Sequence, residues 1–136
     1  MDREKLKEYF ANNSEVEFLD VAPRKIRFKS MDHEVKYYTI ALQMKVKDRY
    51  HKALAYLLAF DDNISDNEER LKACFDFEND SIKPGVLEEA WVTGMDRRIL
   101  TLAFNLWNES NSADISYVFG GADVEHLLEA VRIRFA

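Results

Sequence analysis

The sequence contains only one cysteine, four glycines and two prolines among its 136 residues. The single cysteine, Cys74, excludes an internal disulfide framework and a zinc ribbon. The few glycines form no phosphate-binding loop, no dinucleotide fingerprint and no Gly-x-Ser-x-Gly elbow, which disfavours nucleotide hydrolysis and acyl transfer by those routes. No apolar run reaches the length of a membrane span. These absences predict a cytoplasmic protein without membrane contact.

The composition is that of a folded domain with an uneven charge. Hydrophobic residues make up 47% of the chain and aromatic residues 12%, and the length of 136 residues predicts a single domain, 1–136. Residues 1–60 carry twelve Lys/Arg and nine Asp/Glu, whereas residues 61–136 carry seven and sixteen, within a net charge of −6. The acidic second half favours a host protein with a basic surface as the partner, and makes nucleic acid a less favoured one.

Apolar residues at helical spacing predict a mainly α, compact, bundle-like fold for residues 30–136. The expected core helices span residues 31–46, 48–60, 96–108 and 123–135. Their expected N-caps are Ser30, Asp48, Asp96 and Asp123. Because the first of these helices carries apolar residues on more than one face, we expect it to lie at the centre of the fold.

The first 29 residues are expected to extend this core with a short helix at 2–12 and a minor β-hairpin. Val16 and Phe18 alternate with polar residues before Ala22-Pro23, and Ile26 and Phe28 alternate with charged residues after it.

Farther along the chain, residues 61–69 are predicted to be a loop. Ser65 and Glu68 have the spacing of a capping box for a helix that ends near Phe75. Lys83-Pro84 is expected to break the chain and to start a short helix.

Acidic and aromatic residues gather in FDFENDSIKPGVLEEAWVTG, residues 75–94. The alternating acids fail the calcium-loop pattern, because Ser81 stands where a glycine is required and Leu87 where a glutamate is required. An exposed contact surface is the better functional interpretation, with a tryptophan at the helix end as an aromatic anchor. The partner-binding candidates are Asp76, Glu78, Asp80 and Trp91.

We expect no cofactor, no metal site and no catalytic residue. His33, His51 and His126 are far apart and lie in no metal-binding motif. Cys74 lies in an apolar helical pattern and is expected in the core. An enzyme that uses His51 with Asp76 and Asp80 is a third alternative, which depends on whether the fold brings these side chains together.

A basic stretch offers an alternative function. Four basic residues alternate with Ile26 and Phe28. They suit contact with nucleic acid by a regulatory protein that acts as a monomer or a dimer. These residues are Arg24, Lys25, Arg27 and Lys29. Charged residues are also common on edge strands, where they prevent aggregation.

Four separated motifs, KVKDRYHKALAYLLAF, FDFENDSIKP, LAFNLWN and EAVRIRF, resemble those of an uncharacterised family of small proteins. This domain-of-unknown-function family occurs in Firmicutes and in their phages and integrative elements, and the similarity runs from about residue 28 to the end. It implies a compact helical fold but no reaction and no catalytic residues. The mobile-element setting implies a non-enzymatic protein-binding module that inhibits a bacterial defence system, similar to anti-CRISPR proteins. A homodimer is compatible with this interpretation.

Overall fold

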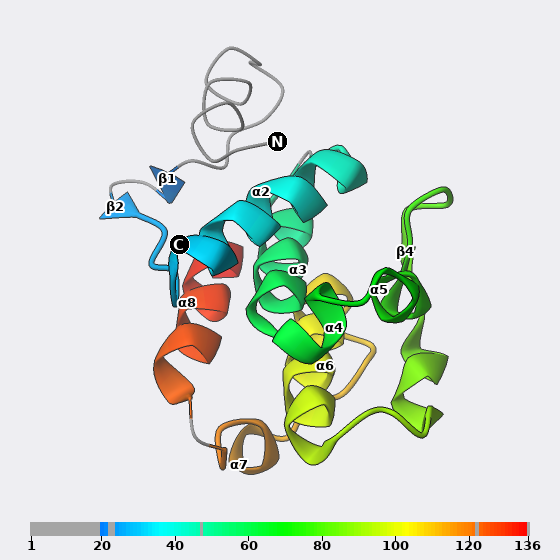
Figure 1. The fold of residues 1–136 in the computed structure, drawn as a ribbon. Coiled ribbons are helices and arrows are strands. Elements are labelled where there is room, and N and C mark those ends of the chain that lie inside the picture. The colour runs from blue at the N-terminus through cyan, green and yellow to red at the C-terminus, as the bar shows by residue number, and fades with distance from the viewer. Residues whose placement is uncertain (1–19, 22–23, 47, 122, 136) are drawn as a thin grey trace.

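The fold is known from a computed structural model that describes residues 20–21, 24–46, 48–121 and 123–135 (Figure 1). The helix expected at 2–12, and the strand expected around Val16 and Phe18, lie outside these residues. The described chain is compact and mainly α, with a small antiparallel sheet near its start. This arrangement confirms the predicted fold class.

Helices make up most of the described chain. They are α2 (Met31–Met44), α3 (Arg49–Phe60), α4 (Asp62–Ser65), α5 (Glu68–Cys74), the 3-10 helix η1 (Pro84–Glu88), α6 (Gly94–Trp107), α7 (Ile115–Val118) and α8 (Val124–Phe135). The strands are β1 (Asp20–Val21), β2 (Arg24–Lys25), β3 (Phe75–Asp76) and β4 (Ser81–Ile82). None of the described helices is long and apolar enough to cross a membrane.

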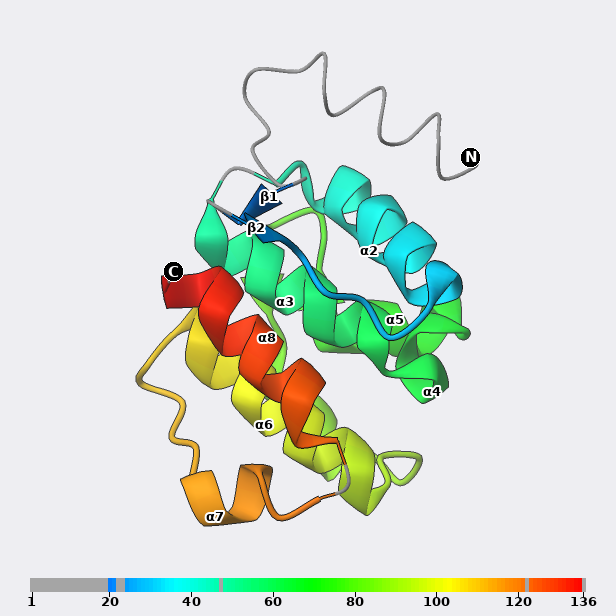
Figure 2. The same ribbon diagram turned by 90° about the vertical axis from the view of Figure 1, so that its left-hand side faces the viewer.

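Helix α3 lies at the centre of the molecule, with α2, α6 and α8 packed around it (Figure 1, Figure 2). Every residue from 51 to 60 is buried, because the run ALAYLLAF is apolar on all faces and such a helix is stable only when it is surrounded. The expectation that α2 is central is therefore wrong. Helix α2 keeps a solvent face, on which Thr39 and Gln43 are exposed.

Aromatic side chains fill the space between α2 and α3. Tyr37 from α2 and Tyr56 from α3 are fully buried. Phe28 precedes α2 and lies over both, with its ring centroid 5.4 Å from that of Tyr37 and 5.9 Å from that of Tyr56. Contacts of this kind add to the hydrophobic stabilisation of the helix pair.

His33 is a buried polar residue at the edge of this aromatic layer. Its Nδ1 accepts a hydrogen bond from the backbone N–H of Lys29 at 3.0 Å, so its Nε2 carries the proton and donates to the Tyr56 carbonyl at 3.0 Å. Burial lowers the pKa of His33 to about 4. At neutral pH this histidine is therefore an uncharged structural link between α2 and α3.

Three of the four expected N-caps are confirmed. Ser30, Asp48 and Asp123 each accept a hydrogen bond from the backbone N–H three residues later. The fourth is wrong, because α6 begins earlier and Thr93 is its N-cap. Asp96 instead occupies the third helical position, where its carboxylate accepts the Thr93 N–H and completes a capping box.

The acidic stretch that precedes α5 is not a loop, contrary to the sequence prediction. It contains the single turn α4, capped by Asp61, whose side chain accepts the N–H of Asn63 at 3.0 Å. Asn67 caps α5, and Ser65 ends α4 and donates its hydroxyl to the Asp61 carbonyl at 3.0 Å. The predicted capping box at Ser65 fails because Asn67, an equally good cap, stands closer to the helix.

Two short hairpins complete the fold. Strands β1 and β2 pair antiparallel, with Val21 opposite Arg24. The strand predicted through Ile26 and Phe28 is wrong, since both residues follow β2 as irregular chain. Strands β3 and β4 form a second hairpin, with Phe75 opposite Ile82, which the sequence did not predict. It begins where α5 ends, and Phe75 is buried while the turn extends outward (Figure 1).

Candidate functional site

The turn of the β3–β4 hairpin is built around Asp76. One oxygen of its carboxylate accepts the backbone N–H groups of Glu78 at 3.1 Å and Asn79 at 3.0 Å, and the other accepts the Asn79 side-chain amide at 2.8 Å. The side-chain and backbone hydrogen bonds from Asn79 lower the pKa of Asp76. Asp76 therefore organises the turn of the hairpin.

Asp80 connects this turn to the core. Its Oδ1 lies 2.8 Å from Nε2 of His51, and the other ring nitrogen of His51 lies 2.7 Å from Oδ1 of Asp48. Asp80 has a positive φ of 52°, which is uncommon outside glycine, although Asp and Asn tolerate it best. The contact with His51 thus holds both the side chain and the backbone of the turn in place.

His51 is held between two carboxylates. Carboxylates only accept hydrogen bonds, so both contacts form when the imidazole carries a proton on each nitrogen. Burial alone would raise the pKa of Asp48, but hydrogen bonds from the backbone and ring of His51 lower it. Trp107 packs edge-on against His51, with the ring centroids 4.8 Å apart. His51 therefore contacts both the N-cap of its own helix and, through Asp80, the hairpin.

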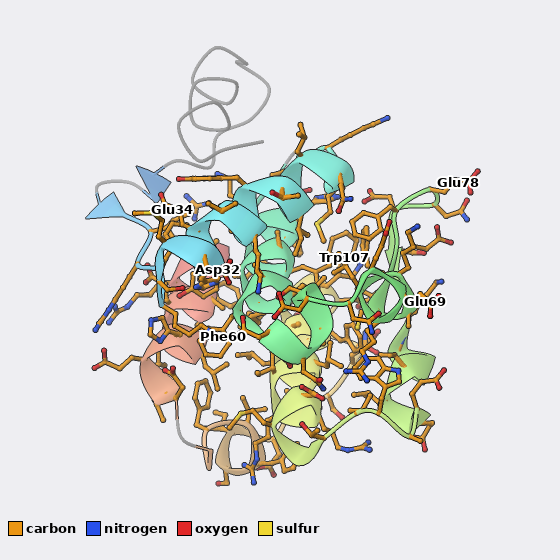
Figure 3. All side chains as sticks on the ribbon, viewed as in Figure 1. Asp32, Glu34, Phe60, Glu69, Glu78 and Trp107 are labelled. Atoms are coloured by element: carbon orange, nitrogen blue, oxygen red, sulfur yellow. The ribbon has the colours of Figure 1, made fainter. Side chains whose placement is uncertain are left out.

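Glu78 and Trp91 differ in exposure and in their contacts. Glu78 is exposed at the tip of the hairpin, and Figure 3 shows it pointing away from the body of the protein, as Glu69 of α5 does. Trp91 follows η1 and is partly buried, with the guanidinium of Arg70 5.1 Å from its ring centroid. The four candidate residues are therefore close in sequence but differ in role. Among the three acids, only Glu78 has a side chain that takes part in none of the described hydrogen bonds and ion pairs.

The basic stretch is partly engaged within the fold. Nη1 of Arg27 lies 2.6 Å from Oε2 of Glu125 in α8, and Nζ of Lys29 donates to the Phe60 carbonyl at 2.8 Å. Arg24 and Lys25 form β2. The contacts of Arg27 and Lys29 reduce the positive charge that this stretch can offer to a phosphate backbone.

A second polar cluster, which the sequence did not reveal, lies at the C-terminal end of α3. Asp61 directly follows α3 and Asp96 lies in the first turn of α6, and both are buried. Asp96 Oδ2 accepts the N–H of Thr93 at 2.8 Å and the amide of Asn63 at 2.6 Å. Asp61 Oδ2 has no donor in the described chain, so it is satisfied when its own carboxyl is protonated and donates to Asp96.

The two carboxyls of this cluster share a proton near neutral pH. Burial, together with the neighbouring Asp96 carboxylate, raises the pKa of Asp61 to about 7. Burial alone would raise the pKa of Asp96, but hydrogen bonds from Asp61, Thr93 and Asn63 lower it. Burial and the two nearby acids also raise the pKa of the Cys74 thiol to about 12. Cys74 is fully buried, as predicted, and its thiol stays protonated.

The histidines and acids do not form a metal-binding arrangement in the part of the chain that the structure describes. The rings of His33 and His126 lie 6.4 Å apart. His51 is remote from them, because it lies near the start of α3 and His33 bonds Tyr56 towards the end of that helix.

His51 and Asp80 do meet, as an enzyme that uses them would require, but Asp76 faces its own turn. Both His51 nitrogens bind carboxylates, which leaves neither to exchange a proton with a substrate in this geometry.

Comparison with known proteins places these features in a family. Residues 23–136 match the family of unknown function DUF6075. The chain belongs to this family. No curated protein and no solved structure shows a significant match.

The DUF6075 region contains both polar clusters and the whole β3–β4 hairpin, and only β1, among the described elements, lies before it. The prediction of an uncharacterised domain family is confirmed. Membership in DUF6075 assigns no reaction and no partner, so the functional argument rests on the residues themselves.

Proposed function

We propose that this DUF6075 protein is a non-enzymatic module that binds a protein with a basic surface. The contact surface is the acidic edge, which we define as residues 66–89 and which comprises α5, the β3–β4 hairpin and η1. This stretch contains eight Asp/Glu and three Lys/Arg. Its exposed acids are Asp66, Glu68, Glu69, Glu78, Asp80, Glu88 and Glu89.

The observation that carries this proposal is the order of the hairpin. Three hydrogen bonds to Asp76 shape its turn, and the contact between Asp80 and His51 ties it to α3. A loop ordered before binding loses less conformational entropy when a partner arrives, so its acids can contribute to affinity as well as to electrostatic steering. Glu78 stands at the tip of this ordered element and is exposed (Figure 3).

The half-buried Trp91 provides the apolar part of the contact. Arg70 covers its ring and also donates to Oδ1 of Asn63 at 2.6 Å, so the guanidinium is held in place. Tryptophan and arginine are among the residue types enriched at the energetic centres of protein interfaces.

The resemblance of the sequence motifs to a family found in mobile elements extends the proposal. In that setting the basic partner is a component of a bacterial defence system, which this protein inhibits by occupying its surface. The alternative, contact with nucleic acid through Arg24, Lys25, Arg27 and Lys29, has less support because Arg27 and Lys29 already bond within the fold.

Charge reversal at the hairpin tip tests the proposal. Reversal at Asp76 or Asp80 is unsuitable, since either change disrupts the turn itself. Glu78→Lys leaves these bonds intact and is expected to weaken capture of the host partner by about tenfold or more, with a steep dependence on salt. The readout is pull-down from host lysate with quantitative mass spectrometry, followed by affinity measurement with the purified partner.

Glu125→Lys is the matched control, because it makes the same charge change at an exposed position of α8 outside the acidic edge, where only an exposed ion pair with Arg27 is lost. The proposal predicts loss of the partner with Glu78→Lys and retention with Glu125→Lys. Equal capture by the wild type and both variants, with unchanged circular dichroism, would show that the acidic edge is not the contact surface.

A further inference from the structure

A cavity of about 410 Å³ lies at the end of the molecule where α3 begins and where α6 and α8 end. Figure 2 shows these three helix ends coming together near the C-terminus. Tyr50 of α3, Trp107 of α6 and Arg134 of α8 contribute to its walls. Its volume lies in the range of small-molecule sites, and it is separate from the acidic edge.

Arg134 is held rigidly at this cavity. Its guanidinium carbon lies 3.7 Å from the centroid of the Tyr50 ring and 4.6 Å from that of Phe135, and its Nε donates to the Leu106 carbonyl at 3.0 Å. No carboxylate of the described chain forms an ion pair with it, so its terminal nitrogens are available to a ligand. A fixed guanidinium presents two parallel donors, which match the oxygens of a phosphate.

The other walls combine flat apolar surface with hydrogen-bonding groups. Tyr50 is 43% exposed and Phe135 is 66% exposed, so both residues offer aromatic surface to a planar group beside the guanidinium of Arg134. Asn108 and the exposed Glu109 line the same cavity and supply acceptors for N–H groups. One cation, one acid and stacking rings together suit a ligand that is flat, carries N–H donors at one end and is anionic at the other.

From this arrangement we propose that the cavity binds a nucleotide of mononucleotide size. The phosphate accepts hydrogen bonds from Arg134, the base stacks on Tyr50 or Phe135, and Glu109 accepts from N–H groups of the base. Stacking on an aromatic ring favours binding of any base, and a bidentate arginine contact adds specificity for the phosphate.

Titration calorimetry on the full chain tests this proposal with four probes: nucleoside monophosphates, the matching nucleosides, inorganic phosphate and benzoate. We expect the monophosphates to bind at least about tenfold more tightly than each of the other three probes, because only they use both the arginine and the rings. Binding of benzoate as tight as that of the nucleotides, or no heat with any monophosphate, would overturn the proposal.

Arg134→Gln is expected to weaken monophosphate binding by about tenfold or more. Arg132→Gln is the matched control, because this arginine is exposed on the same helix and does not line the cavity, and it should bind as the wild type does. Undiminished binding by Arg134→Gln would contradict the assignment. If that variant does not fold, Arg134→Lys keeps the charge without the planar fork, and it should bind monophosphates several-fold more weakly.

Discussion

The two ends of α3 differ in the side chains that contact their aspartates. At its start, the His51 ring lies between Asp48 and Asp80, with one ring nitrogen within hydrogen-bonding distance of each carboxylate. At its end, Asp61 and Asp96 lie together without a cation among the described hydrogen bonds and ion pairs of either residue. The first end holds the hairpin through the contact between His51 and Asp80, whereas the second is more stable when Asp61 retains its proton.

This difference explains why two aspartates that each cap a helix have pKa values shifted in opposite directions. Asp48 and Asp61 each stand at a helix start and accept a backbone N–H, yet the pKa of Asp48 is lowered and that of Asp61 is raised to about 7. Hydrogen bonds from His51, three residues along the same helix, lower the pKa of Asp48, whereas burial and the distant Asp96 raise that of Asp61.

The largest expected effect comes from removing the charge at the C-terminal end of α3. The pKa of Asp61 is raised from its ordinary 3.8 to about 7, so this carboxyl favours folding fully below pH 4 and loses that effect as the pH rises through 7. Asp61→Asn keeps the cap and places an amide donor against Asp96. At pH 8 it should raise the free energy of unfolding by roughly 3 kcal/mol, after allowance for partial solvation.

Urea unfolding between pH 4 and pH 8 measures this gain, which should shrink towards zero at pH 4. Asp114→Asn is the control, since Asp114 also caps a helix, by accepting the N–H of Tyr117, but is exposed. A pH-independent difference between Asp61→Asn and the wild type would mean that the two carboxyls do not share a proton.

A smaller effect is expected at the N-terminal end of α3. His51→Ala removes the ring that contacts both Asp48 and Asp80, together with its contact with Trp107, and should lower the free energy of unfolding by about 2 kcal/mol. Because the Asp48 cap uses the backbone N–H of residue 51, α3 should remain helical. Hydrogen exchange of the hairpin amides at residues 75–82 should accelerate.

His126→Ala provides the comparison for that experiment. His126 also bonds to the capping aspartate of its own helix and stacks on Phe60, but it makes no described contact with the hairpin. Its replacement should leave hairpin exchange unchanged. If both variants accelerate it equally, the bond between His51 and Asp80 is not what orders the turn.

The smallest effect is expected from a change that keeps the shape of Asp80. Asp80→Asn preserves an acceptor for His51 and a side chain that tolerates positive φ, so it should cost about 0.5 kcal/mol. Asp80→Ala loses both and should cost about 2 kcal/mol. Thermal unfolding of the two variants measures the difference, and equal midpoints would contradict a role for Asp80 in anchoring the turn.

The helices were largely predictable, and the candidate site was predictable only in part. Apolar periodicity located α2, α3, α6 and α8 to within a few residues, because it reports the face that each helix buries. The β3–β4 hairpin was missed, since its strands have two residues each and carry no measurable alternation. The composition of the segment identified the acids of the hairpin. It did not predict that Asp76 forms the turn, that Asp80 anchors it to His51, or that Glu78 is exposed at the tip.

The sequence by itself determined the mainly α fold and most helix starts, because caps and apolar periodicity act between residues a few positions apart. Only the tertiary structure decided which distant side chains meet. His51 and Asp80 are separated by 29 positions, and Asp61 and Asp96 come from different helices. Their charges depend on the burial and the neighbours that helix packing creates, and no local pattern contains that information.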